Sequence, residues 1–390
     1  MIYKFDNCTF NGEVDSENRM LKGIITYDNG DTFEGEFKDN KKYKGVYTWQ
    51  DGSVYDGYHN KNGQSHGKGT YTWPNGNIYE GDWVNGKREG YGIFTHADGG
   101  KYEGEWACDQ YNGKGTYYYP GGGSFVGNWL NGDKHGRGVL TTADGTIFEG
   151  KWEKNKIKGK GVRISPSGSK MIGKWEGDEV VGVGKVILAS GAVYKGTLKE
   201  RKYDGKGTFK AANGDFYKGE FKKGKLCGYG VMKYANRNVY KGEWKENVRN
   251  GFGTLRYKDG VYVGNFKDNV PHGKGREKKK NGATYEGDYK NGLKDGRGEY
   301  NSKDGAKYTG EWENDLPSGK GTYWYSDNSM YNGEFKDAFP HGYGAMYYPN
   351  GDKYEGDWVG GKRHGYGKYT LAGGQVLYDG LWQNNEPKTR

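Results

Sequence analysis

The stretch Tyr79–Gly92 reads YEGDWVNGKREGYG, and a nearly identical stretch, YEGDWVGGKRHGYG, spans Tyr354–Gly367. In the first copy Tyr79, Gly81 and Trp83 alternate with acidic residues, which is the period of a β-strand with one aromatic face. An Asn-Gly pair follows, which favours a two-residue hairpin turn, and a second strand with a Gly-x-Gly signature comes after it. The stretch therefore predicts a β-hairpin.

The pattern aromatic-x-Gly-x-aromatic recurs along the whole chain. Its 17 first positions are Phe10, Phe33, Tyr55, Tyr79, Tyr102, Phe125, Phe148, Met171, Tyr194, Tyr217, Tyr240, Tyr262, Tyr285, Tyr308, Tyr331, Tyr354 and Tyr378. Twelve of the 16 intervals are 23 residues long, and Gly-x-Gly follows most first positions by 11 residues. The 73 glycines are therefore placed by a repeat, and periodicity of this kind is typical of repeat architectures.

Stacked hairpins predict an all-β fold, an elongated, single-layer, twisted antiparallel sheet of tandem 23-residue hairpins. Glycine between aromatic residues leaves room for a ring to lie over bare backbone, so aromatic residues replace the usual core. We expect one continuous array over residues 1–390. Residues 1–32 would form an N-terminal cap with a first degenerate repeat, residues 33–377 the regular repeats, and residues 378–390 a C-terminal half-repeat cap and tail.

Several functional classes are excluded by the composition and spacing. No run of 18 apolar residues and no signal-peptide core is present, and three separated cysteines favour a reducing compartment. Five of the seven histidines directly precede a Gly-x-Gly, so the repeat explains them better than convergence on a metal does. Carboxylates on the open face of a sheet lack the desolvation that acid–base catalysis requires. We predict no enzyme activity, catalytic residue, cofactor or metal.

The two stretches quoted first resemble the MORN repeat, and the resemblance covers nearly all of the chain. It implies an extended sheet of hairpins without enzymatic activity. Proteins built only of such repeats are cytoskeletal scaffolds in cilia, radial spoke heads, centriole-associated structures and the cortex of protists, and some dimerise through terminal repeats. In junctophilins and plant phosphatidylinositol-phosphate kinases, such segments are linked to membranes and acidic phospholipids.

The aromatic face is the first candidate interaction site. A single layer is not expected to bury this face fully, so it would offer an aromatic groove to a helix or extended segment of a protein partner. The candidate residues are Tyr79, Trp83, Tyr102, Trp106, Trp129, Tyr240, Trp244, Tyr308, Trp312, Tyr354 and Trp358. The strand edges of the terminal repeats also favour pairing into a homodimer.

A basic middle third is the second candidate site. Residues 1–150 carry 15 Lys/Arg and 21 Asp/Glu, residues 151–300 carry 35 and 17, and residues 301–390 carry 10 and 12. The candidate residues are Lys195, Lys218 and Lys241, then Lys222, Lys223 and Lys225, then Lys278, Lys279 and Lys280. For any single lysine, an exposed ion pair with a neighbour such as Glu220 or Glu243 is the simpler interpretation.

As a region, this excess of positive charge favours an acidic partner: a tubulin tail, an acidic protein or anionic lipid. RNA is the least favoured partner, because the repeat already uses the aromatic residues that single-stranded nucleic acid would need.

A few units depart from the pattern. Met171 replaces the first aromatic residue of its unit, Leu198 replaces the second one in the next unit, and His59 stands where a Trp is expected. Glu277 and Lys279 stand where other units have aromatic residues. Local weakening of the stack is expected at these positions.

Two functions remain open. The first is a non-enzymatic scaffold of a cilium (axoneme, radial spoke or basal body) or of the cortical cytoskeleton, in the cytoplasm, which binds protein partners along the aromatic groove. The alternative is a peripheral membrane adaptor that binds phosphoinositides through the basic middle repeats.

Overall fold

A computed structural model describes residues 2–388, which form 36 strands of one antiparallel sheet. Each strand pairs with its neighbours in sequence, as the register of β8 between β7 and β9 illustrates. This confirms the predicted all-β, single-layer fold of tandem hairpins. Contacts divide the chain into two units, one of residues 1–191 and 198–201 and one of residues 192–197 and 202–390, and each is described separately.

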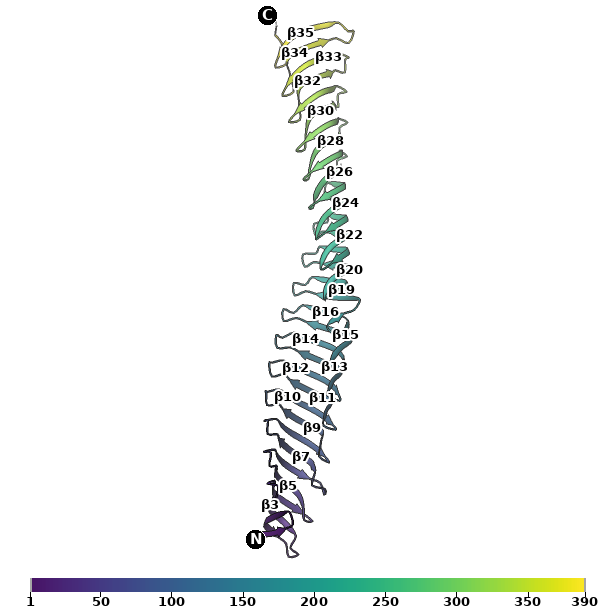
Figure 1. The fold of residues 1–390 in the computed structure, drawn as a ribbon. Helices are drawn as coiled ribbons and strands as arrows, with labels where there is room; N and C mark the ends of the chain where they lie inside the picture. The colour runs from purple at the N-terminus through teal and green to yellow at the C-terminus, as the bar shows by residue number, and fades with distance from the viewer. Residues whose placement is uncertain (1, 389–390) are drawn as a thin grey trace. The chain divides into compact units, whose positions relative to one another are not determined.

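The first unit contains β1 (Ile2–Phe5), β2 (Cys8–Val14), β3 (Met20–Tyr27), β4 (Thr32–Lys38), β5 (Lys41–Thr48), β6 (Val54–His59), β7 (Ser65–Thr72), β8 (Ile78–Val84), β9 (Lys87–Thr95), β10 (Lys101–Ala107), β11 (Gln110–Tyr118), β12 (Ser124–Leu130), β13 (Asp133–Thr141), β14 (Ile147–Glu153), β15 (Lys156–Ile164), β16 (Lys170–Glu176), β17 (Glu179–Val180) and β18 (Val183–Ile187). Within this unit, Figure 1 shows consecutive hairpins side by side in sequence order.

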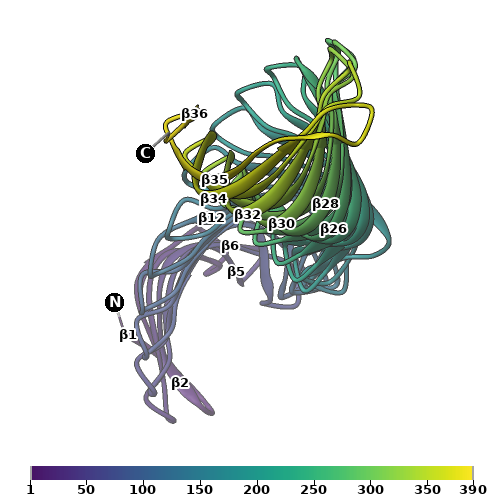
Figure 2. The same ribbon diagram turned by 90° about the horizontal axis from the view of Figure 1, so that it is seen from above.

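The second unit contains most of β19 (Val193–Lys199), then β20 (Lys202–Lys210), β21 (Phe216–Lys222), β22 (Lys225–Lys233), β23 (Val239–Lys245), β24 (Val248–Tyr257), β25 (Gly260–Lys267), β26 (Val270–Lys279), β27 (Thr284–Lys290), β28 (Leu293–Asn301), β29 (Lys307–Glu313), β30 (Leu316–Trp324), β31 (Met330–Lys336), β32 (Phe339–Tyr347), β33 (Lys353–Val359), β34 (Lys362–Thr370), β35 (Val376–Gln383) and β36 (Glu386–Pro387). Seen along the stacking direction, the strands of this unit are curved bands that overlie one another (Figure 2).

The turn inside each hairpin fixes its register. In the hairpin of β8 and β9, Asn85 and Gly86 both have positive φ, 50° and 80°, which is the backbone of a type I′ turn. Tyr79 then lies opposite Phe94, and Gly81 lies opposite Gly92. These side chains share one side of the sheet, which we call the aromatic face, and the opposite side is the outer face.

In most repeats the first aromatic ring lies over a pair of glycines. Tyr79 lies so close to Gly81 and Gly92 that a Cβ at either glycine would collide with its ring, and its hydroxyl donates a hydrogen bond to the carbonyl of Asp82 (3.0 Å). Desolvation of the hydroxyl raises the pKa of Tyr79 above its ordinary value. The ring is completely buried. Glycine on facing strands therefore supplies the space that a second layer would otherwise provide.

Over most of each unit the rings form a stack, because a second aromatic residue contacts two first ones. Trp106 meets Tyr102 of its own unit and Tyr79 of the preceding unit edge-on, at 5.4 and 5.1 Å between ring centroids. Its indole N–H donates to the carbonyl of Gly92 at 3.2 Å. Such edge-to-face pairs contribute about 0.5–1.5 kcal/mol each beyond area burial. The stack couples neighbouring repeats through direct side-chain contact.

A covering row closes the stack from above. The residue opposite each second aromatic residue lies over the rings, as Arg88 does with its guanidinium carbon 4.3 Å from the Trp106 ring centroid. Arg88 Nε also donates to Asp109 Oδ1 at 3.1 Å. Other members stack flat, as Tyr111 does on Tyr102 with 3.8 Å between centroids. The first aromatic residues are thus enclosed by glycine below, rings at the edges and this row above.

The two glycines of Gly-x-Gly have different tasks. The first, Gly90, has a φ of 66° at a β-bulge, where the Asp82 side chain lies beside it. The Asp82 carboxylate accepts a hydrogen bond from the backbone N–H of Tyr91 at 3.0 Å. The second, Gly92, is the glycine under the Tyr79 ring. Both positions therefore require glycine, one for backbone conformation and one for space.

The departures from the repeat have unequal consequences. His59 keeps the stack continuous, with its imidazole 5.3 Å from Phe33 and 5.1 Å from Tyr55. The series of ring contacts ends at Trp152, one unit before Met171, since the next ring, Phe148, contacts only Trp175 among the rings of residues 2–388. In the Met171 unit, Val180 occupies the space over Gly173 that a ring fills in other units. Glu277 is hydrogen-bonded by the Tyr257 hydroxyl and paired with Lys279 at 3.0 Å, so a polar pair replaces rings there.

We predict that Gly310→Ala disrupts its repeat, because the new Cβ would collide with Tyr308 and with the backbone of Gly321. Overpacking of this kind costs about 1–3 kcal/mol, so amide hydrogen exchange in β29 and β30 should accelerate about tenfold or more. Gly373→Ala is the matched control, because no atom lies within 4 Å of the Cβ position there. Equal exchange rates in the two variants would contradict this role for glycine.

We also predict acid sensitivity at His59. Burial lowers its pKa to about 4, and its Nδ1 has no hydrogen-bond partner within residues 2–388. The unfolded chain takes up the proton near a pKa of about 6.5, so stability of this repeat should fall as pH drops from about 6.5 toward 4. Proteolysis within residues 54–72 should therefore increase at pH 5 relative to pH 7. His59→Phe introduces the residue that the preceding repeat has at the equivalent position, Phe37, and should remove the difference between pH 5 and pH 7. If the difference persists in this variant, protonation of His59 is not its cause.

Candidate functional site

The aromatic groove expected from the sequence is filled by its own rings. All eleven candidate side chains lie inside the stack and are between 0 and 6% exposed. The reasoning that a single layer cannot bury its aromatic face does not hold for them, because the glycine pairs and the covering row enclose each ring. They form the core of the sheet, and accessible surface must be sought elsewhere.

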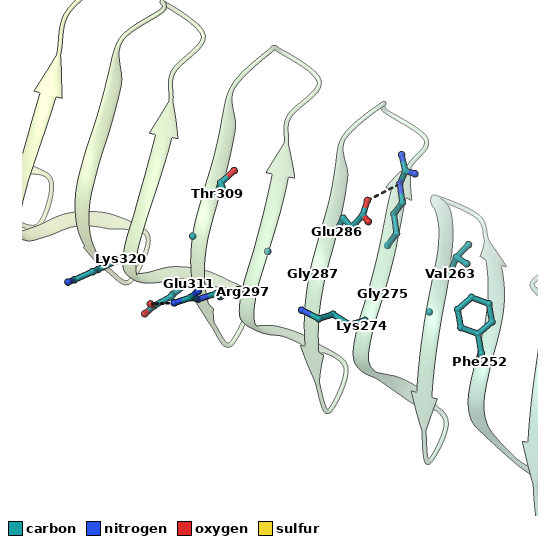
Figure 3. A pocket seen from close by; sticks show the side chains of 14 residues that line it. Phe252, Val263, Lys274, Gly275, Glu286, Gly287, Arg297, Thr309, Glu311 and Lys320 are labelled. Carbon is teal, nitrogen blue, oxygen red and sulfur yellow. Dashed lines mark ion pairs between the residues drawn. The ribbon is translucent and has the colours of Figure 1, made fainter.

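An open groove lies on the outer face of the second unit, behind the glycine pairs. It has a volume of about 810 Å³ and crosses β24 to β30, with glycine backbone as its floor. Phe252 and Val263 line one end, and Lys320 lies at the other (Figure 3). Phe252 is 55% exposed, an unusual state for a large apolar side chain. We call this surface the outer groove.

Charge in the outer groove is mixed with a basic excess. Its charged lining residues are Lys274, Arg276, Glu286, Arg297, Glu311 and Lys320. Arg276 Nε lies 3.8 Å from Glu286 Oε2, and Arg297 Nη2 lies 3.9 Å from Glu311 Oε1. Dashed lines mark both ion pairs in Figure 3. Lys274 pairs with Asp288 at 2.8 Å. Pairs this exposed contribute little to stability, so their charges remain available to a partner.

Shorter hollows of the same kind recur on the outer face within each unit. One of about 530 Å³ in the first unit is lined by Tyr58 and Tyr91, and another in the second unit by Tyr343 and Tyr347. Tyr91, Tyr343 and Phe252 all occupy the middle position of Gly-x-Gly, which points away from the stack. An aromatic residue at this middle position is visible in the sequence. It was not predicted as a site, because the prediction considered only the aromatic positions that recur in nearly every repeat.

The candidate lysines fall into three separate places. Lys195, Lys218 and Lys241 are exposed on the outer face and follow one another, with Thr208 and Val231 on the strands between them. This set is called the lysine row. Lys222, Lys223 and Lys225 lie at the β21–β22 turn, and Lys278, Lys279 and Lys280 lie at the end of β26 and in the turn after it. The structure therefore does not join all nine into one patch.

The lysine row has no ion-pair partner in the described part of the chain. The neighbouring carboxylates expected to pair with it are placed at bulges: Glu243 accepts the backbone N–H of Phe252 at 3.2 Å, and Glu220 lies beside Gly228. By contrast, Lys225 pairs with Glu246 at 3.4 Å and Lys279 with Glu277. The charge of the row is thus the least compensated of the three groups.

Nothing in residues 2–388 indicates catalysis. No group of three His, Cys, Asp or Glu side chains in that range is placed to hold a metal ion. Among the same residues, no helix is long and apolar enough to cross a membrane.

Comparison with known proteins identifies the repeat. Single-layer tandem hairpins with a ring over each glycine pair define a β-repeat protein, a class of scaffolds and interaction proteins. The MORN repeat model matches 14 segments: residues 33–54, 61–78, 79–101, 102–124, 125–147, 148–170, 194–216, 217–239, 240–261, 262–284, 285–307, 308–330, 331–353 and 354–376. These cover well over half of the chain, which belongs to the MORN-repeat family.

The other comparisons add little. No curated protein matches the chain. The chain is similar to the SAS-4 (dCPAP) TCP domain of Drosophila melanogaster, solved in complex with a proline-rich motif of Ana2 (dSTIL), with 14% identity and a TM-score of 0.27 over 40% of this chain and 84% of that one. The chain is also similar to the TCP10 domain of Danio rerio CPAP in complex with a STIL peptide. The identity is 10% and the TM-score is 0.23, over 85% of this chain and 99% of that one. At such TM-scores the likeness carries no argument about function.

Proposed function

We propose that the protein is a non-enzymatic scaffold of a cilium (axoneme, radial spoke or basal body) or of the cortical cytoskeleton. It holds segments of partner proteins in the outer groove while the aromatic stack keeps the sheet ordered. The observation that carries the proposal is the division of labour between the two faces. The rings of the aromatic face are buried and stabilise the sheet. The outer face carries an open groove with exposed Phe252 and with charged side chains that are accessible to a partner.

The physical basis for a scaffold is the coupling between repeats. Each repeat contacts its neighbours through the stack, so stability accumulates along the array and no repeat needs a partner to fold. Aromatic anchors in a groove often dominate the affinity of peptide recognition. The cytoskeletal setting comes from the resemblance to scaffolds made only of MORN repeats, some of which dimerise through terminal repeats, and a homodimer is part of the proposal.

The test is localisation of the full chain, tagged, in a ciliated or protist cell. We predict signal at the axoneme, basal body or cortex, and loss of that signal in Phe252→Ser. Phe339→Ser is the matched control, because Phe339 is 57% exposed, lies in the same unit and is outside the outer groove. A diffuse wild-type signal, or equal loss in both variants, would count against the scaffold proposal.

The alternative, a peripheral adaptor that binds phosphoinositides, is favoured by one observation, the unpaired lysine row. Neighbouring lysines in the row are two strands apart, about 10 Å, and face the same way. A lysine at an anionic bilayer surface contributes roughly 1 kcal/mol, so three in a row could hold the sheet to a membrane only weakly. The lysines around Lys222 and Lys278 lie at strand ends and in turns. They would contact the membrane together with the lysine row only if the sheet tilted.

Sedimentation with vesicles containing phosphoinositide distinguishes the two functions. The adaptor proposal predicts co-sedimentation at about 0.15 M salt, where screening is near physiological. Replacing Lys195, Lys218 and Lys241 by Glu should abolish it, whereas replacing Lys303, Lys307 and Lys336 by Glu should have little effect. Wild-type protein that stays in the supernatant would rule the adaptor function out.

A further inference from the structure

A second aromatic surface exists in the first unit, beside the stack and distinct from the outer groove; Tyr71, for example, lies 6.1 Å from the stacked Trp83. It comprises two columns of rings on the aromatic face near the loops between repeats: Tyr47, Tyr71, Phe94 and Tyr117 in one, and Trp49, Trp73, His96 and Tyr119 in the other. All except Phe94 are partly exposed. We call this surface the aromatic strip.

The rings of the aromatic strip contact one another without interruption. Within a repeat the two columns lie 4.4–4.9 Å apart between centroids, as for Tyr71 and Trp73 at 4.4 Å. Between repeats, Trp49 contacts Tyr71 at 5.3 Å and Trp73 contacts Phe94 at 5.4 Å. In the following repeat these positions hold Leu140 and Thr142, so the strip ends there. An aromatic pair at the same two positions recurs in the second unit, as Tyr323 and Tyr325 at 4.5 Å, but the run of four consecutive repeats with rings at both positions lies in the first unit.

The indole donors of the strip are free, unlike those of the stack. Trp83 and Trp106 each donate their ring N–H to a glycine carbonyl. Within residues 2–388 no acceptor bonds to the ring N–H of Trp49 or Trp73, or to the hydroxyl of Tyr71. Partly exposed rings with unused donors can bind an apolar segment that offers backbone carbonyls.

The spacing of the strip selects among backbone conformations. Each repeat adds two strands, about 9.6 Å along the stacking direction. A polyproline II helix repeats every three residues, about 9.3 Å, and its carbonyls make no internal hydrogen bonds. An α-helix presents the same face once per turn, about every 5.4 Å, so two turns span about 10.8 Å, and its carbonyls are already used in internal hydrogen bonds. A β-strand places residues on one face about 6.7 or 13 Å apart, which does not fit.

Charge along the strip adds a preference for acidic flanks. Lys42 Nζ lies 4.1 Å from the Tyr47 ring centroid, and Lys134 Nζ lies 5.3 Å from that of Tyr119. Neither lysine forms an ion pair within the described residues. A cation therefore stands at each end of the strip. At the Lys42 end, Asp31 accepts a hydrogen bond from the Tyr47 hydroxyl at 2.8 Å and partly offsets the charge, so the preference for a carboxylate next to a proline run is stronger at the Lys134 end.

We propose that the aromatic strip binds a proline-rich segment of a partner protein in the polyproline II conformation, flanked by acidic residues and running along the stacking direction. Proline rings lie between the Tyr and Trp rings of successive repeats, and the free indole N–H groups donate to backbone carbonyls of the ligand. This function is independent of the outer groove, which lies on the other face and in the other unit.

The test uses the full chain and a fluorescein-labelled dodecaproline with a glutamate at each end, followed by fluorescence anisotropy. Saturable binding is expected with a Kd of about 10–300 µM, typical of a short preorganised peptide on a small surface. A Gly/Ser peptide of the same length and ends should bind at least tenfold more weakly. No binding of dodecaproline below about 1 mM, or equal binding of the Gly/Ser peptide, would overturn the proposal.

Two double variants separate recognition from folding. Trp49→Ala with Trp73→Ala should weaken binding tenfold or more, while Trp49→Phe with Trp73→Phe keeps a smaller aromatic ring at each position, loses both donors and should weaken it about fivefold. Tyr229→Ala, at a 52% exposed ring of the outer face, should bind as wild type does. If the alanine variant does not fold, the phenylalanine variant decides. Wild-type affinity in a folded Trp variant, or tighter binding of an amphipathic helical peptide at the same site, would refute the assignment.

Discussion

The contact of an aromatic ring with two facing glycines is the interaction on which this structure depends. A single-layer sheet has no second layer to cover its apolar side, and a ring such as Tyr102 can be buried only if it lies flat on its own backbone. Gly104 and Gly115 make this possible, since a Cβ at either would occupy the ring's place. Glycine weakens a strand in isolation, yet here it permits complete or nearly complete burial of a tyrosine or phenylalanine ring in most repeats.

This constraint also decides which surfaces remain for function. Rings such as Trp106, held by two tyrosines and a glycine carbonyl, have no free side to offer a partner. Recognition must therefore use positions that the stack leaves out. The outer face provides the middle residue of Gly-x-Gly, as at Phe252, and the aromatic face provides the residues beyond the stack, as at Trp49 and Trp73. The first kind of position is present in most repeats, whereas four consecutive repeats with rings at both positions of the second kind occur in the first unit.

The sequence predicted the strands and their arrangement as consecutive hairpins, because a period of two, Asn-Gly turns and a fixed repeat all depend on local chemistry. It did not predict how the aromatic face is closed. The covering residue, Arg88 in one repeat, Tyr111 in the next and Pro317 in another, varies in chemistry, so only its position is repeated. The error about an open aromatic groove followed directly, since without this row the rings would indeed be exposed.

The same coupling explains where the array divides. Rings contact one another in series from Phe10 to Trp152 in the first unit and from Tyr194 to Trp382 in the second. In the intervening sequence Phe148 and Trp175 form an isolated pair, and Met171 and Leu198 stand where aromatic residues are expected. The boundary between the units falls at residues 191–192, and the one interior repeat that the family model leaves unmatched is the same one. In a one-dimensional array, stability depends on nearest-neighbour contacts, so loss of the ring contacts removes the strongest of them. Backbone pairing continues between β16 and β18, but at this point aromatic rings no longer connect one repeat to the next.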